Sequence, residues 1–242
     1  PESLLLIGMG LKSQGEDLES QRVLLSAFIA NPQDSQSRFA LLRPWLNRLD
    51  ADDTPGYVSD IAKTVSGSEA AVVAGWKAAR DEDWQALVEL DTQLARVRPT
   101  DQWYLESVKL RADWRMKVTN PELQPRLARE AKRLIDNAIA IFQDPDLYNM
   151  RVAAAYVAGD AIDVIETARR LLHIFDLEVN NAITGRVDVP PSAIDLKLQQ
   201  IEAVRSVVDQ MRRDHNIPAY KTDDLDRELR NIIRRLERLK AD

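Results

Sequence analysis

Two glycines near the start of the chain are the first residues whose spacing could support chemistry. Gly8 and Gly10 follow an apolar run that begins at Leu4, and glycines between a strand and a helix can hold the pyrophosphate of a dinucleotide. That fingerprint requires a third glycine, where this chain has Ser13, and a second strand soon afterwards. Instead, residues 18–30 carry apolar side chains at helical spacing. The stretch therefore indicates a helix, a turn and a second helix rather than a nucleotide site.

Metal and thiol chemistry have few residues to use in this chain. It contains no cysteine and two histidines, His173 and His215, which are far apart in the sequence. Because zinc sites gather several ligands of these types, the sequence predicts no metal site, and it predicts no bound cofactor. The absence of cysteine also excludes disulfides and thiol nucleophiles.

The carboxylates occur in runs beside predicted helix boundaries. The runs are Asp50, Asp52 and Asp53; Asp81, Glu82 and Asp83; and Asp223, Asp224 and Asp226. Negative charge near a helix N-terminus stabilises the helix, so capping accounts for these runs, and residues 50–53 lack the spacing of a calcium loop. The sequence therefore predicts no catalytic residue and no enzyme. A helical enzyme with converging carboxylates in a polar pocket stays an alternative.

The composition favours helices and argues against nucleic acid as a partner. Hydrophobic residues make up 45% of the 242 residues and charged residues 30%, whereas glycine occurs only 8 times. So few glycines argue against a strand-rich fold with many tight turns. The net charge is −6, and no segment is basic enough for a nucleic-acid surface. No apolar run is long enough to span a bilayer, so we expect no direct membrane insertion.

Residues 1–34 have the pattern of two antiparallel helices joined by a turn. Gly8 and Ala27 are small at places where the two helices must approach closely. Gly15 can adopt a positive φ and end the first helix, and Pro32 stops the second because proline cannot continue a helix.

This pattern resembles one unit of the tetratricopeptide repeat (TPR) family, whose period is about 34 residues. The residues that carry the resemblance are Leu4, Ile7, Gly8, Leu11, Gly15, Ser20, Leu24, Ala27 and Pro32. Gly75 and Pro99 repeat the spacing of Gly8 and Pro32, and residues 146–172 give a third match around Gly159. An irregular unit should lie at 35–66. The resemblance implies an all-α solenoid of stacked helical hairpins over residues 1–178, with the second repeat degenerate.

Residues 179–242 depart from the repeat pattern. A long loop at 180–192 precedes a helix from Ser192 to about Arg213, and Thr222 or Asp223 can cap a last helix. That helix carries a heptad-like apolar stripe made of Leu225, Leu229, Ile232, Leu236 and Leu239. We expect this helical hairpin to cap the solenoid, and a homodimer through the stripe is the alternative.

The resemblance also implies a binding surface, because first-helix positions line the concave groove of the TPR family. In the two clearest units these positions hold Leu5, Met9, Lys12, Val72, Trp76 and Arg80. Met9 and Trp76 occupy the same repeat position, where apolar side chains could hold a peptide. A place for Trp76 in the core stays the open alternative.

The function implied by the resemblance is a non-catalytic interaction scaffold that holds a peptide or helix of a protein partner in that groove. The alternative is an accessory or regulatory domain of a larger membrane-anchored or enzymatic protein, because the chain begins with Pro1 instead of methionine. The compartment, cytoplasmic or periplasmic, and the identity of the partner stay open.

Overall fold

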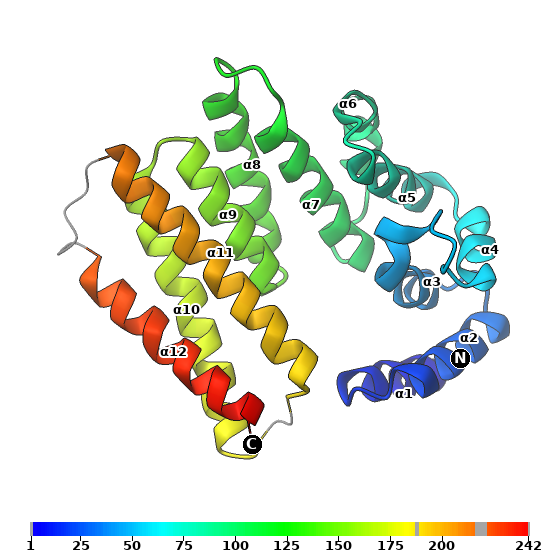
Figure 1. The fold of residues 1–242 in the computed structure, drawn as a ribbon. Helices are drawn as coiled ribbons and strands as arrows, with labels where there is room; N and C mark the ends of the chain where they lie inside the picture. Colours follow the sequence, from blue (N-terminus) through cyan, green and yellow to red (C-terminus); the bar gives the residue numbers. More distant parts are fainter. Residues whose placement is uncertain (1, 187–188, 216–221, 242) are drawn as a thin grey trace. The chain divides into compact units, whose positions relative to one another are not determined.

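The structure is a computed structural model that describes residues 2–186, 189–215 and 222–241, and all regular elements in these ranges are helices (Figure 1). The prediction of an all-α fold is confirmed for this part of the chain. The chain forms two compact units, Pro1–Trp114 and Arg115–Asp242. Each unit is described by itself below.

The first unit begins with the predicted helix, turn and helix. Its elements are α1 (Glu2–Ser13), α2 (Asp17–Ala30), α3 (Ser35–Leu42), the 3-10 segment η1 (Arg43–Arg48), α4 (Gly56–Thr64), α5 (Gly67–Arg80), α6 (Trp84–Leu94) and α7 (Gln102–Lys117), which continues past the boundary. Gly15 ends α1 with a φ of 81°, a conformation that glycine adopts without strain. Asp34 starts α3 by accepting a hydrogen bond from the Ser37 backbone N–H.

Gly8 allows α1 and α2 to approach closely. A β-carbon at this position would lie 2.7 Å from Leu24 Cγ, well inside van der Waals contact. The Ser20 hydroxyl donates a hydrogen bond of 2.7 Å to the Gly8 carbonyl oxygen, so the two helices are joined at the same point. Both Ser20 and Leu24 are buried.

We expect Gly8→Ala to lower the free energy of unfolding by about 1–3 kcal/mol, because the added methyl group overpacks the α1–α2 contact. Gly10→Ala is the matched control, since a methyl group added there would have no neighbouring atom within 4 Å. That change should stabilise the helix by about 0.5–1 kcal/mol. Urea denaturation followed by circular dichroism measures both values, and equal effects of the two substitutions would contradict the close approach.

The segment between residues 35 and 66 is irregular, as the sequence predicts. It divides into α3, η1 and α4, and Pro44 lies in the first turn of η1, a position where proline needs no hydrogen bond from its nitrogen. The following pair, α5 and α6, packs around Gly75, where a β-carbon would lie 2.9 Å from Leu110 Cδ1 of α7.

The second unit contains α8 (Gln124–Ile139), α9 (Pro145–Val157), α10 (Ala161–Ile183), α11 (Pro191–His215) and α12 (Asp223–Ala241). The three longest of the described helices are among them, α10, α11 and α12. Gly159, with a φ of 77°, makes the predicted turn between α9 and α10. The predicted loop at 180–192 is wrong in its first part, because α10 continues to Ile183. The apolar stripe of that helix continues through Phe175 and Val179, which are buried.

One hydrophobic core joins α9, α10, α11 and α12, which lie side by side in Figure 1. Leu225, Leu229, Ile232 and Leu236 of the α12 stripe are buried in this core, and Leu239 packs against it. Complete burial of such a side chain contributes roughly 1.5–3 kcal/mol. The stripe is therefore buried in the core of the second unit, so its side chains are not available as the interface of a homodimer.

The boundary between the two units differs from the one expected from the sequence, and the shared core explains the difference. The sequence predicted a division at residue 178, whereas the compact units divide after Trp114, inside α7. The physical reason is that α9 and α10 bury their apolar faces against α11 and α12. The predicted third repeat and the C-terminal hairpin thus share one core.

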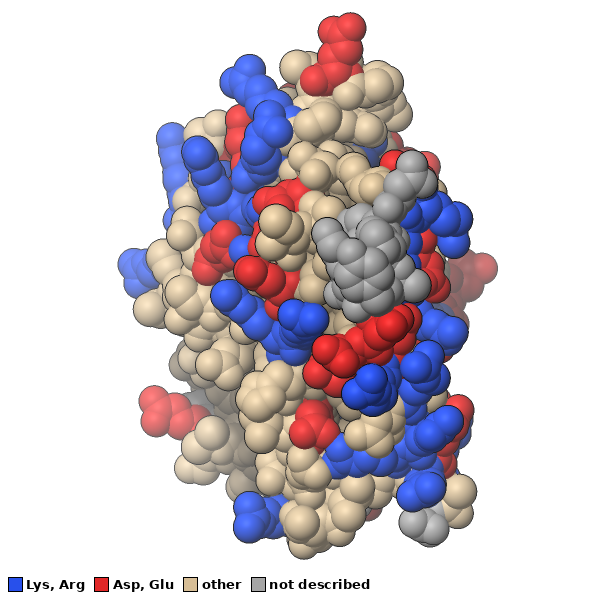
Figure 2. Space-filling view, turned by 90° about the vertical axis from the view of Figure 1, so that its left-hand side faces the viewer, with Lys and Arg blue, Asp and Glu red and all other residues tan. Residues whose placement is uncertain are grey.

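Surface charges are mixed in sign on the face shown in Figure 2, where acidic and basic side chains lie among uncharged ones. In the chain as described, several charged residues pair along one helix, such as Arg205 with Glu202 at 3.5 Å and Arg227 with Asp224 at 3.6 Å. Exposed pairs of this kind contribute about 0.2–1 kcal/mol each. These charged helix faces are solvated, and their ion pairs add little to the free energy of unfolding.

Candidate functional site

Two adjoining pockets open between the α1–α2 hairpin and the segment formed by α3 and η1. The first, here called the Met9 pocket, has a volume of about 210 Å³, and the second, the Trp45 pocket, about 410 Å³. The lining of the Met9 pocket includes Met9, Lys12, Leu24, Phe39, Ala40 and Arg43. The lining of the Trp45 pocket includes Lys12, Leu24, Ala40, Leu41, Trp45 and Tyr57. Because Lys12, Leu24 and Ala40 belong to both, the pockets lie next to each other.

The Met9 pocket combines an exposed thioether with a fixed aromatic wall. Leu5 and Gly8 are the buried residues of α1, whereas the Met9 side chain is 48% exposed. The Phe39 ring meets Trp103 edge-on, with the ring centroids 5.2 Å apart. Trp103 is fully buried and donates from Nε1 to the Ser35 carbonyl oxygen at 3.4 Å. The wall is therefore held in place, whereas methionine can adapt to what it contacts.

Lys12 lies where the two pockets meet. No ion pair within 4.0 Å of its ammonium group is found among the described residues. Partial desolvation lowers the pKa of Lys12, the charge of Asp17 opposes this effect, and the charge of Arg43 adds to it. Desolvation is therefore the main cause of the lowered pKa of Lys12.

Arg43 connects the Met9 pocket with Trp76 of α5. Its Nε lies 2.6 Å from Oε1 of Glu106, whose side chain is almost completely buried. The Arg43 guanidinium group also lies 5.2 Å from the centroid of the Trp76 ring, a cation–π distance. Trp76 is half-buried, and its indole N–H is buried without a hydrogen-bond partner among the described residues. Trp76 therefore supports a pocket residue and does not itself line the pocket.

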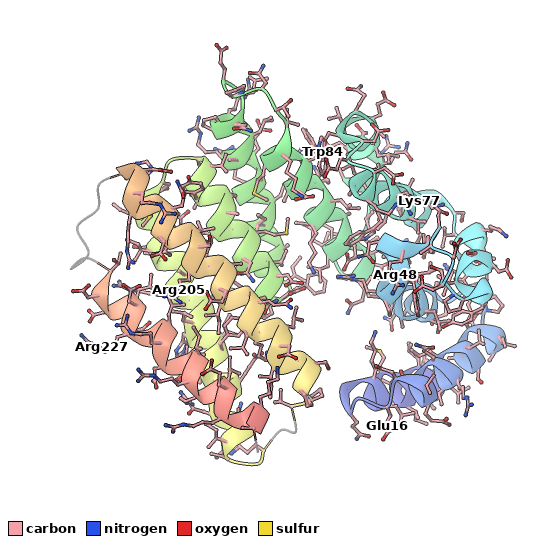
Figure 3. All side chains as sticks on the ribbon, viewed as in Figure 1. Glu16, Arg48, Lys77, Trp84, Arg205 and Arg227 are labelled. Atoms are coloured by element: carbon pink, nitrogen blue, oxygen red, sulfur yellow. The ribbon has the colours of Figure 1, made fainter. Side chains whose placement is uncertain are left out.

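The Trp45 pocket has polar side chains around an aromatic pair. The Arg48 guanidinium group, labelled in Figure 3, lies 5.4 Å from the centroid of the Trp45 ring. The Tyr57 hydroxyl donates to Oε1 of Gln21 at 3.4 Å. Burial raises the pKa of Tyr57, and a hydrogen bond with Trp45 opposes this effect. Tyr57 therefore keeps its proton and stays a hydrogen-bond donor at neutral pH.

The structure separates the residues that the sequence placed in one groove. Met9 and Lys12 line the Met9 pocket together. Leu5 and Val72 are buried in the core, and neither lines the Met9 pocket or the Trp45 pocket. Arg80 is held by Asp50 at 3.2 Å and by Asp81 at 2.8 Å.

Sequence reasoning missed Trp45 and Tyr57. Both lie in the irregular segment at 35–66, where the repeat pattern gives no positions to compare. The sequence feature that could have pointed to them is local composition, because the two aromatic residues flank a loop that is rich in aspartate.

Another pocket, of about 330 Å³, lies between α10 and α12 in the second unit. Its lining includes His173, Asp176 and Glu228, and Asp176 forms an ion pair with Arg235. Within the described ranges, no group of three His, Asp or Glu side chains is arranged to hold a metal ion.

The described helices also lack a membrane-crossing candidate. None of them combines the length and the apolar character that a bilayer crossing needs.

The two adjoining pockets of the first unit, with their apolar and aromatic side chains and the lysine between them, are the candidate site that the geometry supports best. No protein-family model and no curated protein matches the chain in sequence.

Proposed function

We propose that the chain is a TPR-like, non-catalytic interaction scaffold that binds a peptide or helix of a protein partner across the Met9 and Trp45 pockets. The observation that carries this proposal is the pair of adjoining pockets, with an exposed methionine at one end and two aromatic residues at the other. Binding energy at protein interfaces concentrates in aromatic and large apolar side chains that fill such pockets.

The groups in these pockets favour binding over catalysis. General acid–base chemistry requires a titratable side chain within hydrogen-bond reach of the reacting atoms, usually with a second group that orients it. The lining offers Lys12, Arg43, Arg48, a single carboxylate, Asp17, and Tyr57, whose raised pKa keeps its proton in place at neutral pH. Arg43 and Arg48 are engaged by Glu106 and Asp53. The close approach of helices at Gly8 and Gly75 further supports a repeat-like construction.

Selection from a library of random peptides displayed on phage tests this proposal. We expect the wild-type chain to enrich peptides with bulky apolar residues, and Met9→Asp to lose this enrichment, because a carboxylate in the apolar mouth must be desolvated on binding. Leu177→Asp is the matched control, since Leu177 of α10 is 50% exposed and Met9 is 48% exposed. Equal enrichment by wild type and Met9→Asp would reject these pockets as the binding site.

A further inference from the structure

Lys12 lies between the two halves of the candidate site. On one side lie Met9 and Phe39, and on the other lie Trp45 and Tyr57, while Lys12 lines both pockets. A segment that fills both pockets must therefore pass this ammonium group. Whatever the segment carries at that point faces the Lys12 charge at close range.

The charge balance of the site is positive where the pockets meet. Arg43 lies against buried Glu106, and Arg48 forms an ion pair with Asp53. Asp17 acts on Lys12 through space, but it lies beyond ion-pair distance. Lys12 is thus the cation of the lining that has no carboxylate of its own among the described residues. An ammonium group without an ion-pair partner is stabilised by an anion that enters with the partner.

We infer that the partner segment carries a carboxylate between two bulky apolar side chains, with the carboxylate on Lys12 and the apolar groups in the Met9 and Trp45 pockets. This inference rests on the proposed function and adds the chemistry of the partner to it. A phosphate-bearing partner fits less well, because a doubly charged group calls for several converging cations, and the two arginines are already engaged. The apolar and aromatic side chains on both sides, Met9 and Phe39 on one and Trp45 and Tyr57 on the other, favour a peptide over a small anion.

Methionine methyl NMR of the full chain tests the inference, because the chain has only 4 methionines. The probes are three short helix-forming peptides that share two leucines and differ at one central position, which is Glu, Gln or Lys. We expect the Glu peptide to shift the Met9 signal with a Kd about tenfold below that of the Gln peptide, and the Lys peptide to bind most weakly. The Met211 signal is the internal control, since this side chain is fully buried in the second unit.

Two variants separate the charge of Lys12 from general effects. Lys12→Gln should remove the preference for the Glu peptide while the Met9 signal still shifts. Lys63→Gln is the matched control, because Lys63 is an exposed lysine of α4 that pairs with Asp60 at 3.2 Å, and it should keep the preference.

The outcomes distinguish the inference from the proposed function. Equal affinities of the Glu and Gln peptides for wild type, with Met9 shifted by both, would overturn the inference and leave the proposed function standing. A preference for the Glu peptide that survives in Lys12→Gln would also overturn the inference. No shift of Met9 with any of the peptides would count against both.

Discussion

Replacement of Glu69 by alanine is expected to lower the free energy of unfolding by about 3–5 kcal/mol. Glu69 of α5 accepts two hydrogen bonds from the Arg38 guanidinium group of α3, from Nε at 2.8 Å and from Nη2 at 2.9 Å. The two side chains are only 11% and 12% exposed. The substitution leaves the Arg38 charge in a poorly solvated place without its partner, which is the costly case for a buried ion pair. Urea denaturation followed by tryptophan fluorescence gives the value.

Two further variants show whether the loss comes from the unpaired charge. Glu19→Ala breaks an exposed pair with Arg22, whose side chain is 79% exposed, and should change stability by less than about 0.5 kcal/mol. The double variant Arg38→Met with Glu69→Leu removes both charges and should recover most of the loss. If Glu69→Ala lowers the free energy of unfolding as little as Glu19→Ala does, the Arg38–Glu69 pair is effectively solvated.

The parts of the fold that could be predicted from the sequence depend on local spacing. Gly15 and Gly159 end helices with a positive φ, and the glycine requirement is visible in a single sequence. Gly8 could be assigned to a close helix contact because its partner helix follows within one short turn. The end of α10 was missed because Asn180 and Asn181 suggest a loop, whereas the buried apolar stripe continues the helix.

The parts that could not be predicted depend on contacts between distant segments. Arg38 and Glu69 are 31 residues apart, and no periodicity marks them as partners. The apolar stripe of α12 is compatible in sequence with an internal cap, which we expected, and with a homodimer, and its burial against α10 and α11 supports the internal position. For the candidate site, repeat positions identified Met9 and Lys12 but could not reach Trp45, which lies in the irregular η1 segment.

A cluster of ion pairs links α8, α9 and α10 of the second unit. Asp163 of α10 forms ion pairs with Lys132 of α8 and, at 2.5 Å, with Arg151 of α9. Arg151 also contacts Asp136 at 2.5 Å and donates to the Thr167 hydroxyl. The side chains of Lys132, Arg151 and Asp163 are 14% to 17% exposed. Asp163 is therefore the carboxylate that holds α8 and α9 against α10.

The pKa of Asp163 gives this cluster a defined pH dependence. Burial alone would raise the pKa, but the ion pairs with Lys132 and Arg151 outweigh burial and lower it below its ordinary value. A group with a lowered pKa in the folded state stabilises the fold fully above its unfolded pKa, about 3.9 for aspartate. This contribution is lost as the pH falls from there through the lowered value.

We therefore expect Asp163→Asn to lower the free energy of unfolding by about 3 kcal/mol at pH 7, and this difference from wild type to shrink as the pH falls below about 4. It shrinks because wild-type Asp163 then takes up a proton and becomes neutral, like asparagine. Asp60→Asn is the control, since this carboxylate is 76% exposed, and its effect should stay below about 0.5 kcal/mol. Urea denaturation between pH 7 and pH 3 checks both variants. A difference for Asp163→Asn that does not change with pH would mean that geometry and not charge holds the three helices together.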